Sequence, residues 1–307
     1  MTTRSFDVMA TRLVVVLPAD RVELADRVAE IFAEVEATAN EWRDGTPLSQ
    51  VNAAAGGEAV AVPADLRALL ARGLELGERT DGAFDVTWAA LWGLWDFEAD
   101  PPVLPDPEEI ARRVARVDYR QVELDEAAGT VRLARPGMKI GLGGIAKGWA
   151  LDKAVAALRE AGLTDFHVVI GGQVYAAGHK GDRPWHVGIR DPRGARDDVF
   201  AALAVTDRSV STSGDYERYF VLDGTRYHHI LDPRTGWPAR GLRSATVIAP
   251  DATTADGLST ALMVLGKQRA LALVESMPGV EAVLVDEHGA VSQTSGVELV
   301  MLHPPRP

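Results

Sequence analysis

Apolar residues recur at helical spacing in the first third of the chain. The segments 20–38 and 63–80 each place apolar side chains three or four residues apart, which is typical of helices with one buried face. Residues 6–17 are apolar and β-branched, and they predict a first strand. A short amphipathic helix is expected over 107–117. We therefore expect helices that cover a sheet.

Short apolar runs separated by turn residues dominate the rest of the chain. They predict mainly strands, with two helices at 256–265 and 267–277. Because strands follow helices without regular alternation, the class is α+β, and the absence of a clean linker predicts one domain over 1–307. The expected strands cover 122–124, 131–133, 166–170, 174–177, 185–190, 200–205, 209–212, 219–222, 245–249, 282–285 and 297–301.

The segment Gly137–Asp152, GMKIGLGGIAKGWALD, interrupts this pattern with a glycine-dense turn. It reads as a short apolar strand, a turn and a helix that begins near Lys147. Glycines allow close backbone approach, and the N–H groups of a first helical turn together with a lysine favour an anion such as phosphate. The common nucleotide motifs do not match, because Lys147 precedes Gly148 and Trp149 follows it. A purely structural turn is the alternative.

Composition narrows the classes of partner. The chain has 47% hydrophobic residues, enough for a full core, and a net charge of −12, which argues against nucleic-acid binding. It has no cysteine, so disulfides, thiol catalysis and lipid attachment through cysteine are excluded. The only apolar run near the N-terminus, 13–17, is too short for a signal peptide or membrane span. We therefore expect a cytoplasmic protein.

Three tryptophans, Trp88, Trp92 and Trp95, have the spacing of one helical face, which favours a core role over a ligand platform. Further along, His228 and His229 are adjacent. If they lie in a strand, they point to opposite faces, so at most one serves a given site. That histidine could act as a base or ligand, or it could hold the following turn.

A possible metal site lies in ADGLSTALMVLG. Asp256 and Thr260 are four residues apart, so on a helix their oxygens share one face and suit a hard cation such as Mg²⁺. Two oxygen ligands are too few for a full cage, so other groups must complete it. The structural alternative is an N-terminal cap with a hydroxyl that lines the helix.

Six motifs in order make a more specific pattern. AFDVT, GLGGIAKGWALD, the Gly171-Gly172 turn, STSGDYERYF, HHILDPRTG and ADGLSTALMVLG together resemble the ApbE family of flavin transferases. The resemblance runs from Met9-Ala10-Thr11 through the helix of Asp256. It implies one T-fold-related domain, possibly two-lobed, with a mixed or antiparallel sheet covered by helices and an active site in a central cleft. It also implies Mg²⁺-dependent transfer of FMN from FAD to a Thr or Ser hydroxyl of an acceptor protein, with release of AMP.

The resemblance also assigns residues. Asp256, Thr260 and the backbone of Gly144 would hold Mg²⁺, and His229 with Asp256 would be catalytic. A neutral histidine near its usual pKa of about 6.5 suits proton acceptance from the hydroxyl. The residues expected to contact FAD are Met9, Trp42, Ala83, Phe84, Asp85, Gly141, Lys147 and Ile230.

The chain departs from the family pattern at several positions. The family usually has Gly at Ala10, Asp at Gly141, and Asn and Asp where Ile170 and Gln173 flank the Gly171-Gly172 turn. A missing carboxylate at 141 would remove an acceptor from the FAD site. Restoring it would tighten FAD binding, or would cost stability if Gly141 has positive φ. Two other functions stay open, hydrolysis of FAD to FMN and AMP, and FAD binding without turnover.

Overall fold

The computed structural model describes residues 1–306, which form two compact units. Unit 1 contains Met1–Glu36, Ile145–Gly214 and the chain from Gly241 onward, and unit 2 contains Ala37–Gly144 and Asp215–Arg240. Helix α1 (Leu24–Ala39) carries the chain from the first unit into the second. Both units are therefore built from segments that are far apart in sequence, and a single domain over 1–307 stays a prediction.

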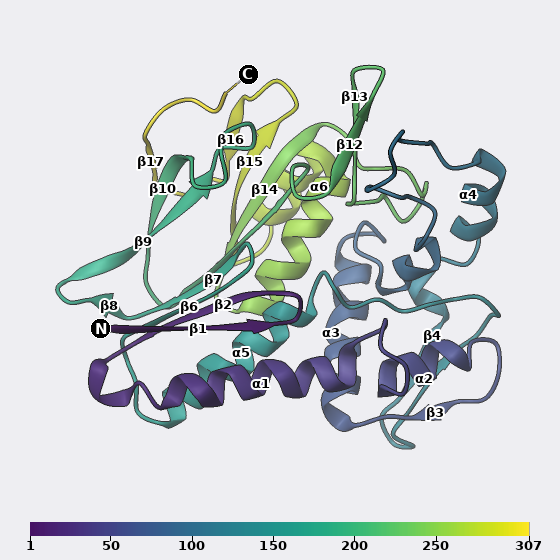
Figure 1. Ribbon diagram of the computed structural model, residues 1–307, viewed down its shortest axis with the longest axis horizontal. Helices are drawn as coiled ribbons and strands as arrows, with labels where there is room; N and C mark the ends of the chain where they lie inside the picture. Colours follow the sequence, from purple (N-terminus) through teal and green to yellow (C-terminus); the bar gives the residue numbers. More distant parts are fainter. Residues whose placement is uncertain (307) are drawn as a thin grey trace. The chain divides into compact units, whose positions relative to one another are not determined.

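Unit 1 is built on an eight-stranded antiparallel sheet (Figure 1). The strands alternate apolar and polar positions, or are apolar throughout where both faces are covered. In spatial order they are β1 (Thr2–Val8), β2 (Thr11–Leu17), β6 (Phe166–Ile170), β7 (Gln173–Ala177), β11 (Arg208–Gly214), β14 (Leu242–Ala249), β15 (Glu281–Asp286) and β16 (Val291–Gln293).

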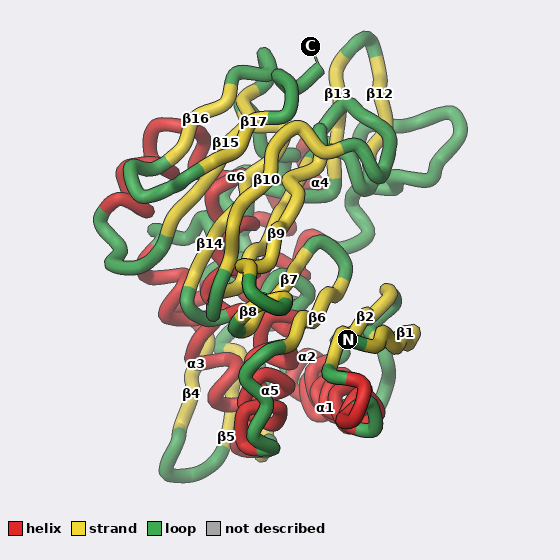
Figure 2. The backbone as a smooth tube through the Cα atoms, turned by 90° about the vertical axis from the view of Figure 1, so that its left-hand side faces the viewer, coloured by secondary structure: helices red, strands yellow, loops and turns green. Residues whose placement is uncertain are grey.

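Two layers cover the faces of this sheet. A four-stranded sheet packs on one face through a core that includes Trp185, Phe200 and Val210. Helix α6 (Ala252–Glu275) lies along β11 and β14, with α5 (Ala146–Glu160) beside it. Figure 2 shows the strands of the smaller sheet, β9 and β10, beside β14 of the main sheet. The smaller sheet consists of β17 (Leu299–Met301), β10 (Val199–Val205), β9 (Arg183–Arg190) and β8 (His179–Lys180), in that order.

Unit 2 is mainly helical, with two small antiparallel sheets. Its helices bury leucine-rich faces, such as Leu66, Leu69 and Leu70 of α3. The helices are α2 (Pro47–Ala53), α3 (Ala64–Arg79), the 3₁₀ helix η2 (Val86–Leu91), α4 (Pro107–Val114) and η3 (Tyr119–Gln121). The sheets are β3 (Val60–Ala61), β5 (Thr130–Leu133) and β4 (Val122–Asp125), and the hairpin of β12 (Tyr219–Leu222) and β13 (Thr225–His228).

The α+β class and the antiparallel sheets are confirmed. The single strand expected over 6–17 is wrong, because β1 and β2 are separate strands joined by a tight turn. Met9 and Ala10 both have positive φ, at 48° and 57°. Two such residues form the turn that matches the twist of a hairpin. Methionine and alanine are not typical of this turn, so the sequence pattern did not predict it.

The strand expected before the glycine turn is also wrong. Ile140 exchanges hydrogen bonds with the side chain of Asn52, at 2.7 Å to Oδ1 and 2.9 Å from Nδ2. The N–H of Gly141 donates to the carbonyl of Val86, 2.8 Å away. The side-chain amide of Asn52 and a carbonyl of the 3₁₀ helix η2 therefore satisfy this backbone in place of a neighbouring strand.

The tryptophan segment differs as well, whereas the break expected near 266 is present. The tryptophans do not share a helical face, because η2 ends at Leu91; Trp95 is buried, whereas 45% of Trp92 is exposed. The helices expected at 256–265 and 267–277 correspond to the two halves of α6, which meet at a kink at Gly266, where φ is 71°. Positive φ at a glycine allows this change of direction without strain.

Candidate functional site

Asp256 lies in the second turn of α6, and only 8% of its side chain is exposed. Its Oδ2 accepts a hydrogen bond of 3.0 Å from the N–H of Gly148, in the first turn of α5. The Nζ of Lys147 lies 3.9 Å from the same oxygen. The positive end of α5 therefore already faces an anion, the carboxylate of Asp256.

Asp256 is not the cap of its helix. The cap is Asp251, which accepts a hydrogen bond of 2.8 Å from the N–H of Thr254. Asp152, on α5, accepts further bonds from the N–H groups of Ala252, at 2.6 Å, and Thr253, at 2.8 Å. Asp251 and Asp152 thus accept the hydrogen bonds of the N–H groups at the start of α6, so Asp256 is not needed as the cap of this helix.

The packing of α5 on α6 fixes this arrangement. A Cβ atom at Gly148 would overlap the carbonyl of Ala252, so only glycine allows the two helices to approach this closely. The Nε2 of Gln173 on β7 donates to that same carbonyl, 2.6 Å away. The backbone of residue 252 is therefore held by α5 and by the sheet.

Thr260 follows Asp256 by one helical turn and belongs to a group of hydroxyls. The Oγ of Ser213 on β11 lies 2.8 Å from the Oγ of Ser259 and 3.4 Å from the Oγ1 of Thr260. Ser259 also donates to the carbonyl of Asp256, 2.9 Å away. Strand β11 thus orients the hydroxyls of α6.

The oxygens of Asp256 and Thr260 are the ligand type that Mg²⁺ prefers. No group of three or more His, Cys, Asp or Glu side chains suited to a metal exists among residues 1–306. A divalent ion would therefore need hydroxyl, carbonyl, phosphate or water oxygens beside a single carboxylate. The donor set fits a weakly held magnesium that arrives with a phosphorylated substrate.

Met9, a second predicted contact in unit 1, lies in the β1–β2 turn. Its N–H donates to the Oε2 of Glu36 over 3.2 Å. Its left-handed conformation, with φ of 48°, is uncommon for a residue with a side chain and places it on a tight turn. The turn projects this methionine side chain, which is partly exposed.

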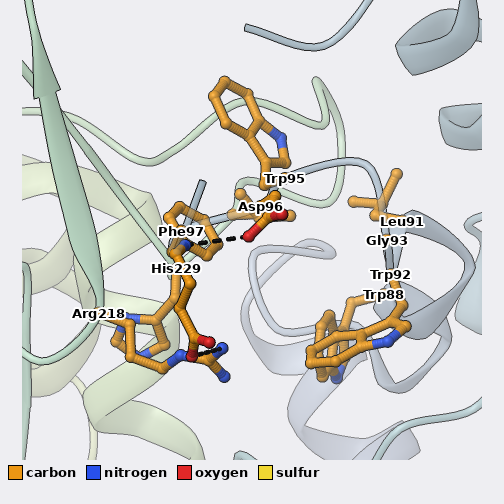
Figure 3. Close-up of a pocket in the computed structure, with 11 residues that line it drawn as sticks. Trp88, Leu91, Trp92, Gly93, Trp95, Asp96, Phe97, Arg218 and His229 are labelled. Atoms are coloured by element: carbon orange, nitrogen blue, oxygen red, sulfur yellow. Dashed lines mark hydrogen bonds and ion pairs between the residues drawn. The ribbon is translucent and has the colours of Figure 1, made fainter. Parts of the chain in front are cut away.

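In unit 2, His229 lines a pocket of about 330 Å³ with aromatic walls. Figure 3 shows Trp88 and Trp92 on one side, with Phe97 and Arg218 on the side of His229. The backbone N–H of His229 donates to the carbonyl of Arg218, 3.0 Å away, because the β12–β13 hairpin ends here. The volume lies at the low end for ligand pockets.

The two histidines have different surroundings. His228 is 3% exposed, and its Nε2 lies 2.8 Å from the carbonyl of Ala239. Burial lowers the pKa of His228, which keeps the ring neutral. The structural interpretation therefore fits His228, whereas His229 faces the pocket.

Trp42 and the glycine turn lie at a second place in unit 2. Trp42 is 44% exposed, its ring centroid lies 4.1 Å from that of Trp92, and the Nζ of Lys139 lies 4.9 Å from its ring. The indole of Trp88 donates to the carbonyl of Gly141 over 3.0 Å. Gly144 ends the same turn and belongs to unit 2.

The remaining predicted contacts in unit 2 are buried. Ala83, Phe84 and Ile230 are at most 7% exposed. Asp85 accepts bonds from the N–H groups of Thr87, at 2.7 Å, and Tyr119, at 3.0 Å, while burial raises the pKa of its carboxyl. Its side chain is thus engaged in holding η2, and a ligand contact here would use the backbone.

Sequence reasoning missed Asp152, Ser213 and Glu41. Asp152 ends the quoted GWALD motif and Ser213 lies in STSGD, so both were visible as motif members without an assigned role. Their partners are between 46 and 101 residues away in sequence, and only the fold brings them together. Glu41 directly precedes Trp42 and carried no signal of its own.

Comparisons with known proteins show related sequences and structures. A family model described as ApbE family matches residues 7–284. A protein of Treponema pallidum named FAD:protein FMN transferase is 39% identical over 296 residues, covering 91% of this chain and 82% of the relative. A relative with the same name from Vibrio cholerae is 34% identical over 262 residues, covering 84% of this chain and 78% of its own.

Solved structures are also similar. The ApbE protein of Thermotoga maritima has a TM-score of 0.86 at 37% identity, covering 96% of this chain and 97% of the other. The flavin transferase ApbE of Vibrio cholerae has a TM-score of 0.83 at 28% identity, with the same coverage. Within residues 1–306, no helix is both long and apolar enough to cross a membrane.

Proposed function

Because the chain belongs to the ApbE family, we propose that it transfers FMN from FAD to a Thr or Ser hydroxyl of an acceptor protein and releases AMP. Several relatives between 32% and 39% identical carry the name of this activity. The observation that carries the proposal in this chain is Asp256, a buried carboxylate that does not cap its own helix, faces the first turn of α5 and is one turn from the hydroxyl of Thr260.

The reaction exchanges the phosphoanhydride bond of FAD for a phosphoester bond to the acceptor. The acceptor oxygen bonds to the FMN-side phosphorus, the bond from that phosphorus to the bridging oxygen breaks, and AMP leaves with that oxygen. The hydroxyl proton must depart as the new bond forms. Catalysis of such a step depends on positioning and on neutralising the charge that develops on phosphate oxygens.

Bound magnesium would supply that neutralisation, held by Asp256, Thr260 and the carbonyl of Gly144. Lys147, beside Asp256, adds a positive charge for the nucleotide phosphates. The hydrogen bond from Gly148 keeps the carboxylate oriented toward the start of α5. These residues bind and orient, and none of them needs to change its protonation state.

His229 is the proposed proton acceptor. It lines a pocket, whereas its neighbour His228 is bonded to a backbone carbonyl. Met9, Trp42, Gly141 and Ile230, with the backbone of 83–85, are the proposed FAD contacts. A cytoplasmic location, expected from the sequence, stays a prediction.

The test is incubation with FAD, Mg²⁺ and a candidate acceptor protein. Transfer leaves covalent flavin on the acceptor and one AMP for each modified hydroxyl. Release of AMP together with free FMN, and no covalent flavin, would identify a hydrolase instead. Bound FAD that survives Mg²⁺ without release of AMP would identify a flavin-binding protein.

A further inference from the structure

Glu41 is a buried carboxylate that the mechanism above does not use. The residue is 8% exposed, and its Oε1 has no hydrogen-bond partner among residues 1–306. Leaving a carboxylate oxygen buried without a donor is costly, so such atoms are rare in folded proteins. The missing partner of Oε1 therefore needs a physical reason.

The other oxygen of Glu41 is held by the glycine turn. The backbone N–H groups of Leu142 and Gly143 are directed at the carboxylate and partly offset the burial that raises its pKa. Because Oε1 has no partner, we assign these donors, together with the N–H of Glu41 itself, to Oε2. Glu41 thus fastens the turn with one oxygen and leaves the second unpaired.

The unpaired oxygen occupies the space beside Gly141. A Cβ atom at Gly141 would lie 3.0 Å from the Oε1 of Glu41, 3.0 Å from the Nε1 of Trp88 and 2.9 Å from the Cβ of Ala89. Contacts this short are rarely found for real side chains. A side chain at residue 141 would therefore collide with the carboxylate of Glu41 as well as with Ala89 and Trp88.

The surroundings of Glu41 suit an aromatic nucleotide. Trp42, the next residue, is 44% exposed, and its ring lies 4.1 Å from that of Trp92, which is 45% exposed, with the two planes tilted by 37°. Lys139 lies over the ring of Trp42 and also acts on the Glu41 carboxylate through its charge. Exposed indole rings beside a carboxylate offer stacking together with a hydrogen-bond acceptor.

We propose that Glu41 is a specificity-determining residue for FAD: Oε2 fixes the glycine turn, and Oε1 accepts a hydrogen bond from a donor group of the nucleotide. This proposal rests on the proposed function. The family pattern places a hydrogen-bond acceptor for FAD on the side chain of residue 141, and in this chain Glu41 would take that role. Water does not reach Oε1, so binding must shift a neighbouring side chain, and side-chain shifts are common on binding.

The substitution Glu41→Gln separates the two oxygens. The single amide oxygen is needed by the N–H groups of Leu142 and Gly143, so the NH₂ group takes the place of Oε1 and turns an acceptor into a donor. The turn keeps its hydrogen bonds while the nucleotide loses its acceptor. Glu58→Gln, an exposed change in the same unit, is the matched control.

The experiment is a fluorescence titration with FAD and FMN, a competition with AMP, and a melting curve for each protein. We expect Glu41→Gln to weaken FAD binding roughly 10-fold or more, with a melting temperature close to that of the unsubstituted protein. Loss confined to FMN places the donor on the flavin half, and loss confined to AMP places it on the adenosine half. Glu58→Gln should bind FAD as the unsubstituted protein does.

Unchanged FAD affinity in Glu41→Gln, or equal losses for FMN and AMP that follow a lower melting temperature, would overturn the proposal. If Glu41→Gln does not fold, Glu41→Asp, which shortens the side chain, is judged by the same criteria. Failure of the unsubstituted protein to bind FAD would overturn the proposed function itself, and this inference with it.

Discussion

Asp256 is buried, so its replacement affects both stability and function. Asp256→Asn keeps the shape but removes the charge that Mg²⁺ needs, and we expect loss of most Mg²⁺-dependent AMP release. We also expect a modest fall in melting temperature, because the hydrogen bond from Gly148 weakens. Asp251→Asn is the control, since asparagine caps a helix about as well as aspartate. Normal turnover and a normal Mg²⁺ requirement in Asp256→Asn would remove this residue from the metal site.

The two histidines should separate in the same assay. His228→Ala leaves the buried carbonyl of Ala239 without its partner, and we expect a loss of about 1–3 kcal/mol in unfolding free energy. His229→Ala, at the pocket, should keep the melting temperature and FAD binding but lose transfer. Equal, modest losses of transfer activity in both variants, in proportion to their lowered melting temperatures, would assign a structural role to His229 too.

Gly141 and Gly143 offer a matched pair. Ala at 141 meets three neighbours at 2.9–3.0 Å, whereas Ala at 143 meets only the Oε1 of Glu41, 4.0 Å away. Gly141 does not have positive φ, so space rather than backbone strain is the obstacle. We expect Gly141→Ala to cost about 1–3 kcal/mol and Gly143→Ala to cost less. Similar melting temperatures for the two variants would show that the space beside Gly141 adapts.

At the residue scale, the sequence could predict contacts that depend on local spacing. Asp256 and Thr260 are one turn apart on any helix, so their shared face followed directly from the sequence. The bond from Gly148 to Asp256 spans 108 residues, and Glu41 reaches a turn 100 residues later. No local pattern encodes such pairs, because their proximity depends on the fold.

The strand β6 carries a partly buried histidine, His167, through which stability should depend on pH. His167 stacks on Trp185 with ring centroids 4.9 Å apart, and burial lowers its pKa to about 4. Between the unfolded value of about 6.5 and about 4, the unfolded chain binds a proton that the folded chain does not. Stability should therefore fall as pH drops through this range.

His167→Gln removes the titrating group, so the contribution of this residue to the dependence of stability on pH should disappear. The measurement is the melting temperature of both proteins at pH 7 and pH 4.5. The melting temperature of the unsubstituted protein should fall more between pH 7 and pH 4.5 than that of the variant. His228 titrates equally in both proteins and does not affect the comparison. An identical loss in the two proteins would show that His167 titrates normally in the folded state.

Elements with strong periodicity were predictable. The expected helix at 63–80 corresponds to α3 (Ala64–Arg79), because its leucine stripe needs a buried face. The β1–β2 turn was not predictable, since Met9 and Ala10 carry no turn signal. The segment before the glycine turn looked like a strand because it is apolar. Only the hydrogen bond from Ile140 to the side chain of Asn52 shows that it does not pair with another strand.

The whole molecule interleaves two units along one chain. Strands far apart in sequence, such as β2 with β6 and β11 with β14, are neighbours in the main sheet. Local propensity contains no information on this order, although it correctly indicated an α+β protein. The motifs identified the family because they span most of the chain, as the match over residues 7–284 also does.

The most direct test of the central claim is mass spectrometry of an acceptor protein after incubation with this chain, FAD and Mg²⁺. We expect that one Thr or Ser gains FMN less one water, that AMP appears in equal amount, and that chelation of Mg²⁺ abolishes both. An acceptor of unchanged mass, while FAD is converted to free FMN and AMP, would contradict this claim.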